Sequence, residues 1–235
     1  VPTPAPATNE CPSSLGTAGQ EGTTCMIYNC DLIATLTHFS SVKHGVDKVV
    51  CHLAADVTPS ATLTPPEPDF ELHGHDHRIV GNMARNTWFD DISTAGRKYA
   101  FYNVTFDTGL YCMRTKRAVD MVVQDCTFLK CGWDGTAASD NTKAAYAALW
   151  ASANTADGGA MRLENANTVR IKNNKVYENL RAVRIQDVTG SSGSLIQGNT
   201  IHDNLEAGIY LAASSGGCEN VEISMSVQQH CRLTP

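Results

Sequence analysis

Arginine recurs at one place in three similar short segments, and a tyrosine takes that place in a fourth. Arg114, Arg162 and Arg184 each follow two small or apolar residues, and Tyr210 follows Gly208-Ile209 in the same way. A guanidinium binds carboxylates, sulfates and phosphates through two parallel hydrogen bonds. Stacked guanidiniums also repel one another unless an anion joins them. These residues therefore predict a site for an anionic polymer, with Tyr210 as a stacking surface for a sugar ring.

The same arginines could instead form a surface ladder that the protein itself neutralises. The carboxylates that the sequence offers for this purpose are Glu164, Asp187 and Glu206. Both interpretations stay open on the sequence alone, because the ion pairs depend on which side chains meet in space.

A second set of residues could carry acid–base chemistry or bind a cation. Lys130, Glu178 and Asp203 occupy equivalent places just before the arginine segments, in a column that Thr108 and Gln229 extend. If Glu178 and Asp203 lie one repeat apart, their separation approaches the value of about 5 Å used by retaining glycosidases. Two carboxylates also suit Ca²⁺, which takes oxygen ligands. The alternative is a salt-bridged ladder with Lys130.

Three alternating histidines form the remaining candidate site. In an extended strand His73, His75 and His77 would share one face. Imidazoles in such a cluster can hold a transition metal. Alternate strand residues are about 6.6 to 7 Å apart, however, which is wide for one tetrahedral ion. We therefore interpret them as solvent-facing histidines.

These candidates lie on a repeat of roughly two dozen residues, which predicts a solenoid. Residues 169–184 and 195–210 align with Asn174 over Asn199, Val176 over Ile201, and Asn179 over Asn204. Their β-branched runs alternate in polarity and are broken by Asn, Asp or Gly, as in short strands joined by tight turns. Strands of successive coils would stack in parallel, with asparagine ladders at the turns.

Earlier and later segments fit the same columns. Residues 122–132 and 101–109 precede the clear pair, and residues 221–231 follow it. The column that contains Asn174 then takes Val104 and Cys126, and the column of Val176 takes Phe106, Phe128 and Val227.

The repeat resembles the right-handed parallel β-helix of pectate and alginate lyases, epimerases and phage tailspikes, over about residues 70–232. The resemblance implies an all-β solenoid. Lyases of this fold neutralise a uronate with Ca²⁺ or a basic side chain and then remove a proton with a base. Lys130, Arg162 and Arg184 could take such roles, but no catalytic signature of the family stands at these positions. The resemblance therefore transfers no catalytic residue.

The chain divides into an N-terminal segment, 1–68, and a β-helix, 69–235. Within the first part we expect loops up to residue 30, an amphipathic helix over 31–43 with Asp31 as N-cap, and a strand over 48–53. Leu32, Leu36 and Phe39 form the apolar face of this helix. Helix and strand would cap the first coil. An insertion at 133–158, with Trp133 and Trp150, would wall the arginine face.

The composition limits the classes of binding partner and the cellular locations that fit this protein. The formal net charge is −6 without a basic run, which disfavours nucleic acid, and no stretch of about 20 apolar residues could insert in a membrane. The first residues carry no positively charged, apolar stretch, and we expect them to be a mature N-terminus or a trimmed edge. Nine cysteines include four near the N-terminus, Cys11, Cys25, Cys30 and Cys51, which predict at least one disulfide there. The others lie among the coils, where cysteine is often a small interior residue.

The leading hypothesis is an extracellular, secreted or virion-surface β-helix that recognises an acidic glycan through Arg114, Arg162, Arg184 and Tyr210, like a tailspike or adhesin. The first alternative is a lyase, epimerase or glycoside hydrolase that acts on an acidic polysaccharide. The second is a structural subunit of a larger assembly, such as a homotrimer that forms through the C-terminal end.

Overall fold

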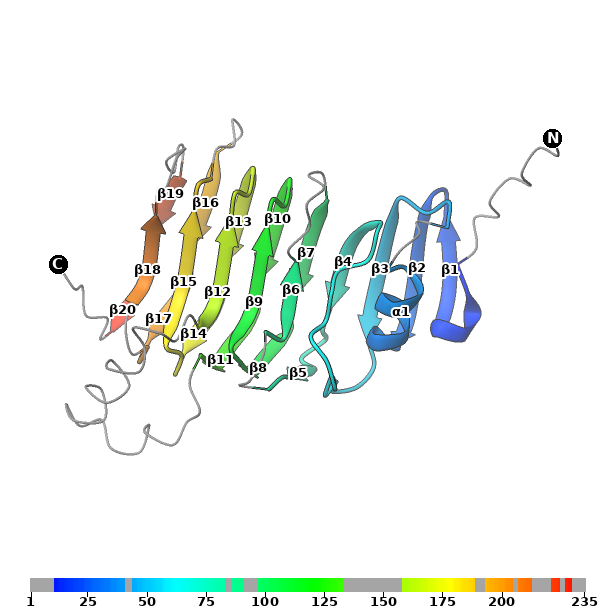
Figure 1. The fold of residues 1–235 in the computed structure, drawn as a ribbon, viewed down its shortest axis with the longest axis horizontal. Coiled ribbons are helices and arrows are strands. Elements are labelled where there is room, and N and C mark those ends of the chain that lie inside the picture. Colours follow the sequence, from blue (N-terminus) through cyan, green and yellow to red (C-terminus); the bar gives the residue numbers. More distant parts are fainter. Residues whose placement is uncertain are drawn as a thin grey trace.

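Three parallel β-sheets wind along one axis in the computed structural model (Figure 1). It describes residues 11–40, 44–82, 86–90, 97–132, 158–188, 193–204, 207–212, 221–224 and 227–229. Sheet A has nine strands: β1 (Thr17–Glu21), β2 (Thr24–Cys30), β3 (Lys48–Leu53), β4 (Asp69–His73), β7 (Lys98–Tyr102), β10 (Asp120–Gln124), β13 (Thr168–Lys172), β16 (Ser194–Gln197) and β19 (Val221–Ser224).

Sheets B and C complete the coils. Sheet B contains β5 (Arg78–Val80), β8 (Thr105–Gly109), β11 (Thr127–Cys131), β14 (Lys175–Tyr177), β17 (Thr200–His202) and β20 (Val227–Gln229). Sheet C contains β6 (Trp88–Asp90), β9 (Tyr111–Lys116), β12 (Gly159–Glu164), β15 (Arg181–Gln186) and β18 (Ala207–Ala212). From β4 onwards each coil gives one strand to each sheet in turn, which confirms the predicted parallel β-helix.

The strand registers confirm most of the predicted columns. Val176 pairs with Ile201, and Phe128 pairs with both Phe106 and Val176. The final column was wrong by one residue, because Val227 pairs with Thr200 and not with Ile201. Gln229 accordingly pairs with His202 and not with Asp203. The pairing in sheet A accounts for this shift. Ile223 pairs with Ile196, which keeps two apolar residues in one column, and the residues that follow Ile223 keep the same offset.

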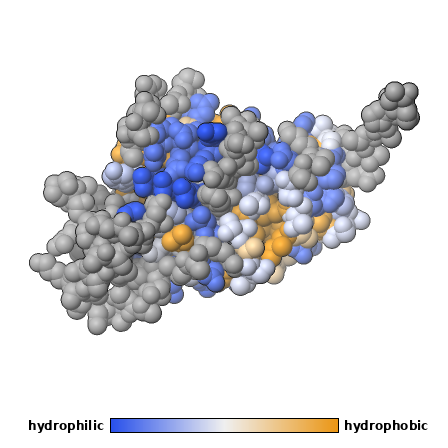
Figure 2. Space-filling view, in the orientation of Figure 1, coloured by the Kyte–Doolittle hydropathy of each residue, from blue (hydrophilic) through white to orange (hydrophobic). Residues whose placement is uncertain are grey.

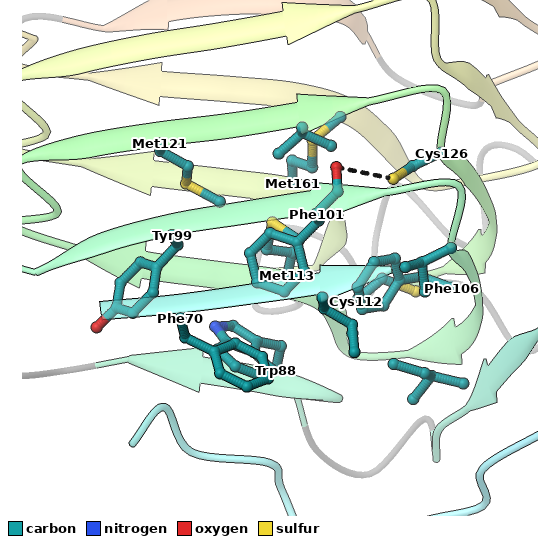
Figure 3. Close-up of a cluster of buried hydrophobic side chains, with 14 of the residues drawn as sticks. Phe70, Trp88, Tyr99, Phe101, Phe106, Cys112, Met113, Met121, Cys126 and Met161 are labelled. Carbon is teal, nitrogen blue, oxygen red and sulfur yellow. Dashed lines mark hydrogen bonds between the residues drawn. The ribbon is translucent and has the colours of Figure 1, made fainter. Parts of the chain in front are cut away.

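A continuous apolar core fills the coils (Figure 3). The rings of Phe106 and Phe128 stack with centroids 5.0 Å apart, and Trp88 meets Phe101 edge to face at the same centroid distance. Met113 and Met161 are fully buried and stack in adjacent coils. The interior therefore consists of ladders of like residues, as the repeat predicts.

Two asparagine ladders bind successive coils together at the turns. The Asn174 side chain accepts a hydrogen bond from the Cys126 N–H at 2.8 Å, and it donates to the carbonyl of Val123. The side-chain oxygen of Asn199 in turn accepts from the backbone N–H of Asn174 at 2.9 Å. Asn179 and Asn204 repeat this arrangement at the next turn. Each amide thus satisfies backbone groups that a tight turn would leave buried and unpaired.

The N-terminal elements extend sheet A. β1 and β2 form an antiparallel hairpin, and β3 continues in parallel to β4. Short 3₁₀-helix η1 (Ser13–Leu15) precedes them. Isolated bridges join Val57 to Ile79 and Leu63 to Trp88, so pairing crosses the predicted division at residue 68. That division and the capping role of this region stay predictions.

The predicted helix is shorter than expected. Helix α1 covers Leu32–His38, with the Asp31 carboxylate capping the Ala34 N–H at 3.0 Å as predicted. It ends at Phe39, whose carbonyl accepts the Glu67 N–H at 2.7 Å instead of continuing the helix. Residues 41–43 lie outside the described residues.

Three disulfides link described cysteines. Cys11–Cys25 and Cys30–Cys51 confirm the predicted N-terminal crosslinking. Cys112–Cys131 joins β9 to β11, so these two coil cysteines are not the separate interior residues that we expected. Cys126 fits that description: its thiol is free and buried, and burial raises its pKa to about 12. The structure is consistent with an extracellular protein in this respect.

Candidate functional site

The three arginines stack on the outer face of sheet C. Arg162 pairs in register with Arg114 on one side and with Arg184 on the other, and Arg184 pairs with Tyr210. Since the preceding residues in β9, β12 and β15 point into the core, the arginines point outward. The register predicted from the sequence is therefore confirmed for all four residues.

Access to this column differs along its length. The Arg162 side chain is 12% exposed and that of Arg114 is 21% exposed. Tyr210 is 51% exposed, and Leu211 beside it is 41% exposed. Within the described part of the column, Tyr210 at the β18 end is thus the most exposed residue, whereas Arg184 is half-buried like the other two arginines.

One carboxylate lies between two of the arginines. Glu164, at the end of β12, forms an ion pair with Arg162 and lies 3.7 Å from a terminal nitrogen of Arg114. Its side chain is only 7% exposed. Part of the predicted internal neutralisation therefore takes place. A buried carboxylate that is shared by two guanidiniums also holds both in place.

Tyrosine rings support the guanidiniums. The buried Tyr111 ring lies 5.9 Å from the Arg114 guanidinium and 5.8 Å from that of Arg162. Arg184 lies in the same way over the Tyr210 ring, at 5.7 Å. These contacts are within the range of cation–π interactions. The sequence analysis missed Tyr111, although its place three residues before Arg114 puts it on the same strand.

Sheet C is basic in an acidic protein. Its strands carry five basic residues and two acidic ones, whereas the protein as a whole has a net charge of −6. Sheet A differs, since Lys48 pairs with Asp69 and Lys98 pairs with Asp120 across its strands. Hydrophilic side chains gather over β9, β12 and β15 in Figure 2, while hydrophobic ones gather near α1. Basic residues thus outnumber acidic ones on the strands of sheet C, whereas the two signs alternate across these strands of sheet A.

The insertion begins and ends beside this face. A Cβ added to Gly158 would lie 2.8 Å from the Cα of Gly132, so the two ends of the insertion touch. The N–H of Gly159, the first residue of β12, donates to Leu110 at 2.9 Å. Trp133 and Trp150 lie outside the described residues, and their predicted role as a wall stays a prediction.

The second predicted set lies where sheets B and C meet: Thr108 and Lys130 are the next-to-last residues of β8 and β11, and Glu178 and Asp203 directly follow β14 and β17. Thr108, Lys130, Glu178 and Asp203 all have positive φ, between 50° and 63°, at the corner between sheets B and C. The Lys130 N–H donates to the Glu178 carbonyl at 3.1 Å, which confirms that they stack. Asp203 accepts a hydrogen bond from His202 at 2.8 Å. The acid–base roles and Ca²⁺ binding stay predictions.

The three histidines do not share a strand face. β4 ends at His73, and His75 has a φ of 49° in the turn that follows. His73 instead stacks on His52 of the preceding strand, with ring centroids 4.5 Å apart. Only the register between β3 and β4 brings these rings together, so residue spacing could not reveal the contact. Within the described part of the chain, no group of three or more His, Cys, Asp or Glu side chains could hold a metal ion.

Three parallel sheets and stacked asparagines define a parallel β-helix. A comparison with known protein families gives the same fold. The sequence model for the right-handed β-helix region matches residues 92–229, more than half of the chain. The protein therefore belongs to the right-handed β-helix family. No curated protein and no solved structure gave a match. None of the helices among the described residues has the length and apolar character needed to span a membrane.

Proposed function

We propose that this β-helix acts outside the cell as a recognition module for an acidic glycan, which it binds on the outer face of sheet C. The fold by itself supports only a carbohydrate-related or structural role in general terms. The observation that carries the finer proposal is the in-register column of Arg114, Arg162 and Arg184 that ends at the exposed ring of Tyr210.

The spacing of the column suits a polymer. Parallel strands lie about 4.8 Å apart, so the column offers one guanidinium per coil in a straight line. Carboxylates or sulfates along a sugar chain can bind such a line, and an exposed tyrosine ring can stack on a sugar. Tyr210 is the exposed end of the column, and we expect it to contact the ligand together with Arg184, whose guanidinium lies over its ring.

Retention on immobilised polygalacturonate and heparin, with neutral dextran as reference, tests the proposal. Arg184→Ala and Tyr210→Ala should each weaken binding about five- to thirtyfold, as expected for the loss of roughly 1–2 kcal/mol. Arg162 is a poorer probe, because its removal would strand the buried Glu164 carboxylate. Arg170→Ala is the matched control, since Arg170 lies on sheet A and pairs with Asp120 at 2.9 Å.

Unchanged retention in both variants, or equal binding to neutral dextran, would refute recognition of an acidic glycan on sheet C. Retention should also fall as salt is raised, because the attraction is largely electrostatic. If retention of Arg170→Ala falls as far as that of Arg184→Ala, the protein binds the polymer through nonspecific charge attraction and not through the sheet C column.

One observation favours an enzyme as the second candidate. The corner column places Thr108, Lys130 and Glu178 in a left-handed conformation that residues other than Gly, Asn and Asp rarely adopt. Other corners mostly follow that preference, for example with Asn103, Asp125 and Asn173. Formation of unsaturated or reducing ends on polygalacturonate, and its loss in Lys130→Ala or Glu178→Gln, would establish this alternative. Binding without product supports the recognition module.

A further inference from the structure

Four aromatic rings form a row on the outer face of sheet A, one on each of four neighbouring strands. Tyr28, His52, His73 and Tyr102 come from β2, β3, β4 and β7. Successive ring centroids are 4.8, 4.5 and 5.0 Å apart, and the planes deviate by at most 21°. Two imidazoles thus lie face to face at the centre of the row, where a charge on one ring is felt directly by the other.

A third imidazole joins the row from the turn after β4. His75 Nε2 lies 2.9 Å from His52 Nδ1, and the two ring planes are 19° apart. With centroids 5.2 Å apart, the rings meet edge to edge, as in an N–H···N hydrogen bond. One of the two nitrogens must lack a proton to accept this bond. The contact therefore survives one protonation of the pair and is lost on the second.

Compensating negative charge around the rings is limited. Glu71, beside His73 on β4, accepts from His73 Nε2 at 2.6 Å and pairs with Lys48 of β3 at 2.5 Å. These contacts hold the pKa of the Glu71 carboxyl at about 2, so it is ionised throughout the range where histidine titrates. The Glu71 carboxylate is thus already shared between the Lys48 ammonium and the His73 imidazole.

The remaining neighbours do not supply an anion to His52. Asp56, in the loop after β3, lies 3.5 Å from His77 Nδ1 and accepts the Arg78 N–H. Asp76 is exposed in the turn, and burial raises the pKa of the Tyr102 phenol. The pKa of His52 is lowered by burial and then by the charges of His73 and His75, against a smaller opposing effect of Glu71.

The turn that carries His75 is conformationally demanding. His75 and Asp76 both have positive φ, of 49° and 68°. The Gly74 N–H donates to Tyr102 at 2.8 Å and the Asp76 N–H to Asn103 at 3.2 Å, which ties the turn to the next coil. Since left-handed conformations cost energy for residues with a side chain, the His52–His75 bond helps to keep the turn closed.

We propose that the imidazoles of His52, His73 and His75 form a pH-sensitive latch, which holds the 74–77 turn against β3 at neutral pH and releases it on acidification. The sign follows from linkage: a histidine that is harder to protonate when closed binds protons preferentially when open. The closed turn therefore has its full stability above about pH 6.5 and loses stability as the pH falls below that value. The inference does not depend on glycan binding.

Hydrogen exchange at the Gly74 and Asp76 amides, corrected for intrinsic rates, tests the latch at pH 7.5 and pH 5.0. Wild-type protection should fall between pH 7.5 and pH 5.0, by at most about thirtyfold, because an open-turn imidazole with the ordinary pKa of about 6.5 lies only about 1.5 units above the lower pH. His52→Phe keeps a flat ring between Tyr28 and His73 but cannot make the bond. Its turn should exchange faster at pH 7.5 and change less than twofold between the two pH values.

His202→Gln is the matched control, because His202 lies on β17 in a distant coil, and the turn should behave as in wild type. Wild-type protection of the turn that is equal at both pH values would overturn the latch, as would a His52→Phe turn that keeps the wild-type pH dependence. Should His52→Phe fail to fold, NMR titration of the wild type decides, because a His52 midpoint at or above 6.5 contradicts the proposal.

Local exchange is the necessary readout because a second histidine pair also titrates. His38 stacks on His44 with centroids 4.4 Å apart near the end of α1, and burial followed by the charge of His44 lowers the pKa of His38. Global unfolding of His52→Phe will therefore retain some acid sensitivity.

Discussion

At the residue scale, asparagine does more than favour a turn in this protein. Asn174 and Asn199 are buried, with exposed fractions of 1% and 0%, yet each side chain has several hydrogen-bond partners. A buried amide is stable only when its donors and acceptors are used. The ladder meets this condition because the same residue in the next coil supplies the missing partner.

Asn174→Leu should therefore destabilise the protein by at least about 1–3 kcal/mol, since it leaves the buried Cys126 N–H without its partner. Urea denaturation at neutral pH measures the change in the free energy of unfolding. Asn167→Ala, at an exposed position in the same coil, should change it by less than about 0.5 kcal/mol. Equal stability of both variants would contradict the ladder.

The Glu164 carboxylate makes the arginines of the sheet C column unequal. Arg114 and Arg162 are held by this buried side chain, so they position the face and are poorly exposed. The column is thus not uniform, and the proposed ligand contact is expected mainly at Arg184 and Tyr210.

At the scale of elements, corners and crosslinks keep short strands in place. Strands of three to six residues form the coils, and single residues with positive φ turn the chain between them. The Cys112–Cys131 disulfide joins the start of β9 to the end of β11, two residues before the insertion begins at residue 133. It thereby fixes the corner from which the arginine face begins.

Replacing both Cys112 and Cys131 by Ala should lower the free energy of unfolding by about 2–4 kcal/mol, because the unfolded chain regains the freedom of a closed loop. Urea denaturation without reductant gives the value. The buried, free Cys126 supplies the control, and Cys126→Ala should cost about 1 kcal/mol. A double variant as stable as wild type would show that the crosslink contributes nothing to this corner.

At the scale of the whole molecule, sheets A and C carry different charge patterns. Sheet A alternates in sign across its strands, whereas sheet C gathers basic residues in a protein of net charge −6. This arrangement would attract an anionic polymer to one side while the net charge keeps the molecules apart. The histidine row and Glu71 lie in the N-terminal coils, on β2, β3, β4 and β7.

Acid unfolding should show a separate contribution from Glu71. Its carboxyl pKa, about 2 in the folded state, lies below the ordinary value of 4.5. The resulting stability is present above pH 4.5 and is lost as the pH falls towards 2, by at most about 3 kcal/mol before solvent screening. Glu71→Gln should therefore lose less stability than wild type between pH 5 and pH 2.5 in urea denaturation. The exposed Glu222→Gln should follow the wild-type curve, and a Glu71→Gln curve parallel to wild type would rule the contribution out.

The sequence alone determined the solenoid, the stacking of Asn174 on Asn199, and the column of Arg114, Arg162 and Arg184. It could do so because a repeat places like residues over like, and coils of nearly constant length transmit one register to the next. The same reasoning failed by one residue at Val227, where the repeat loses its asparagine marker.

Only the tertiary structure decided which side chains meet between unlike coils. The stacking of His52 on His73 and the disulfide between Cys112 and Cys131 depend on loop lengths and corner conformations that no repeat specifies. The left-handed corner at Lys130 and Glu178 was likewise invisible, because those residues do not favour that conformation by themselves. Periodic apolar burial sets the architecture, while the chemistry of its surface depends on contacts between residues far apart in the chain.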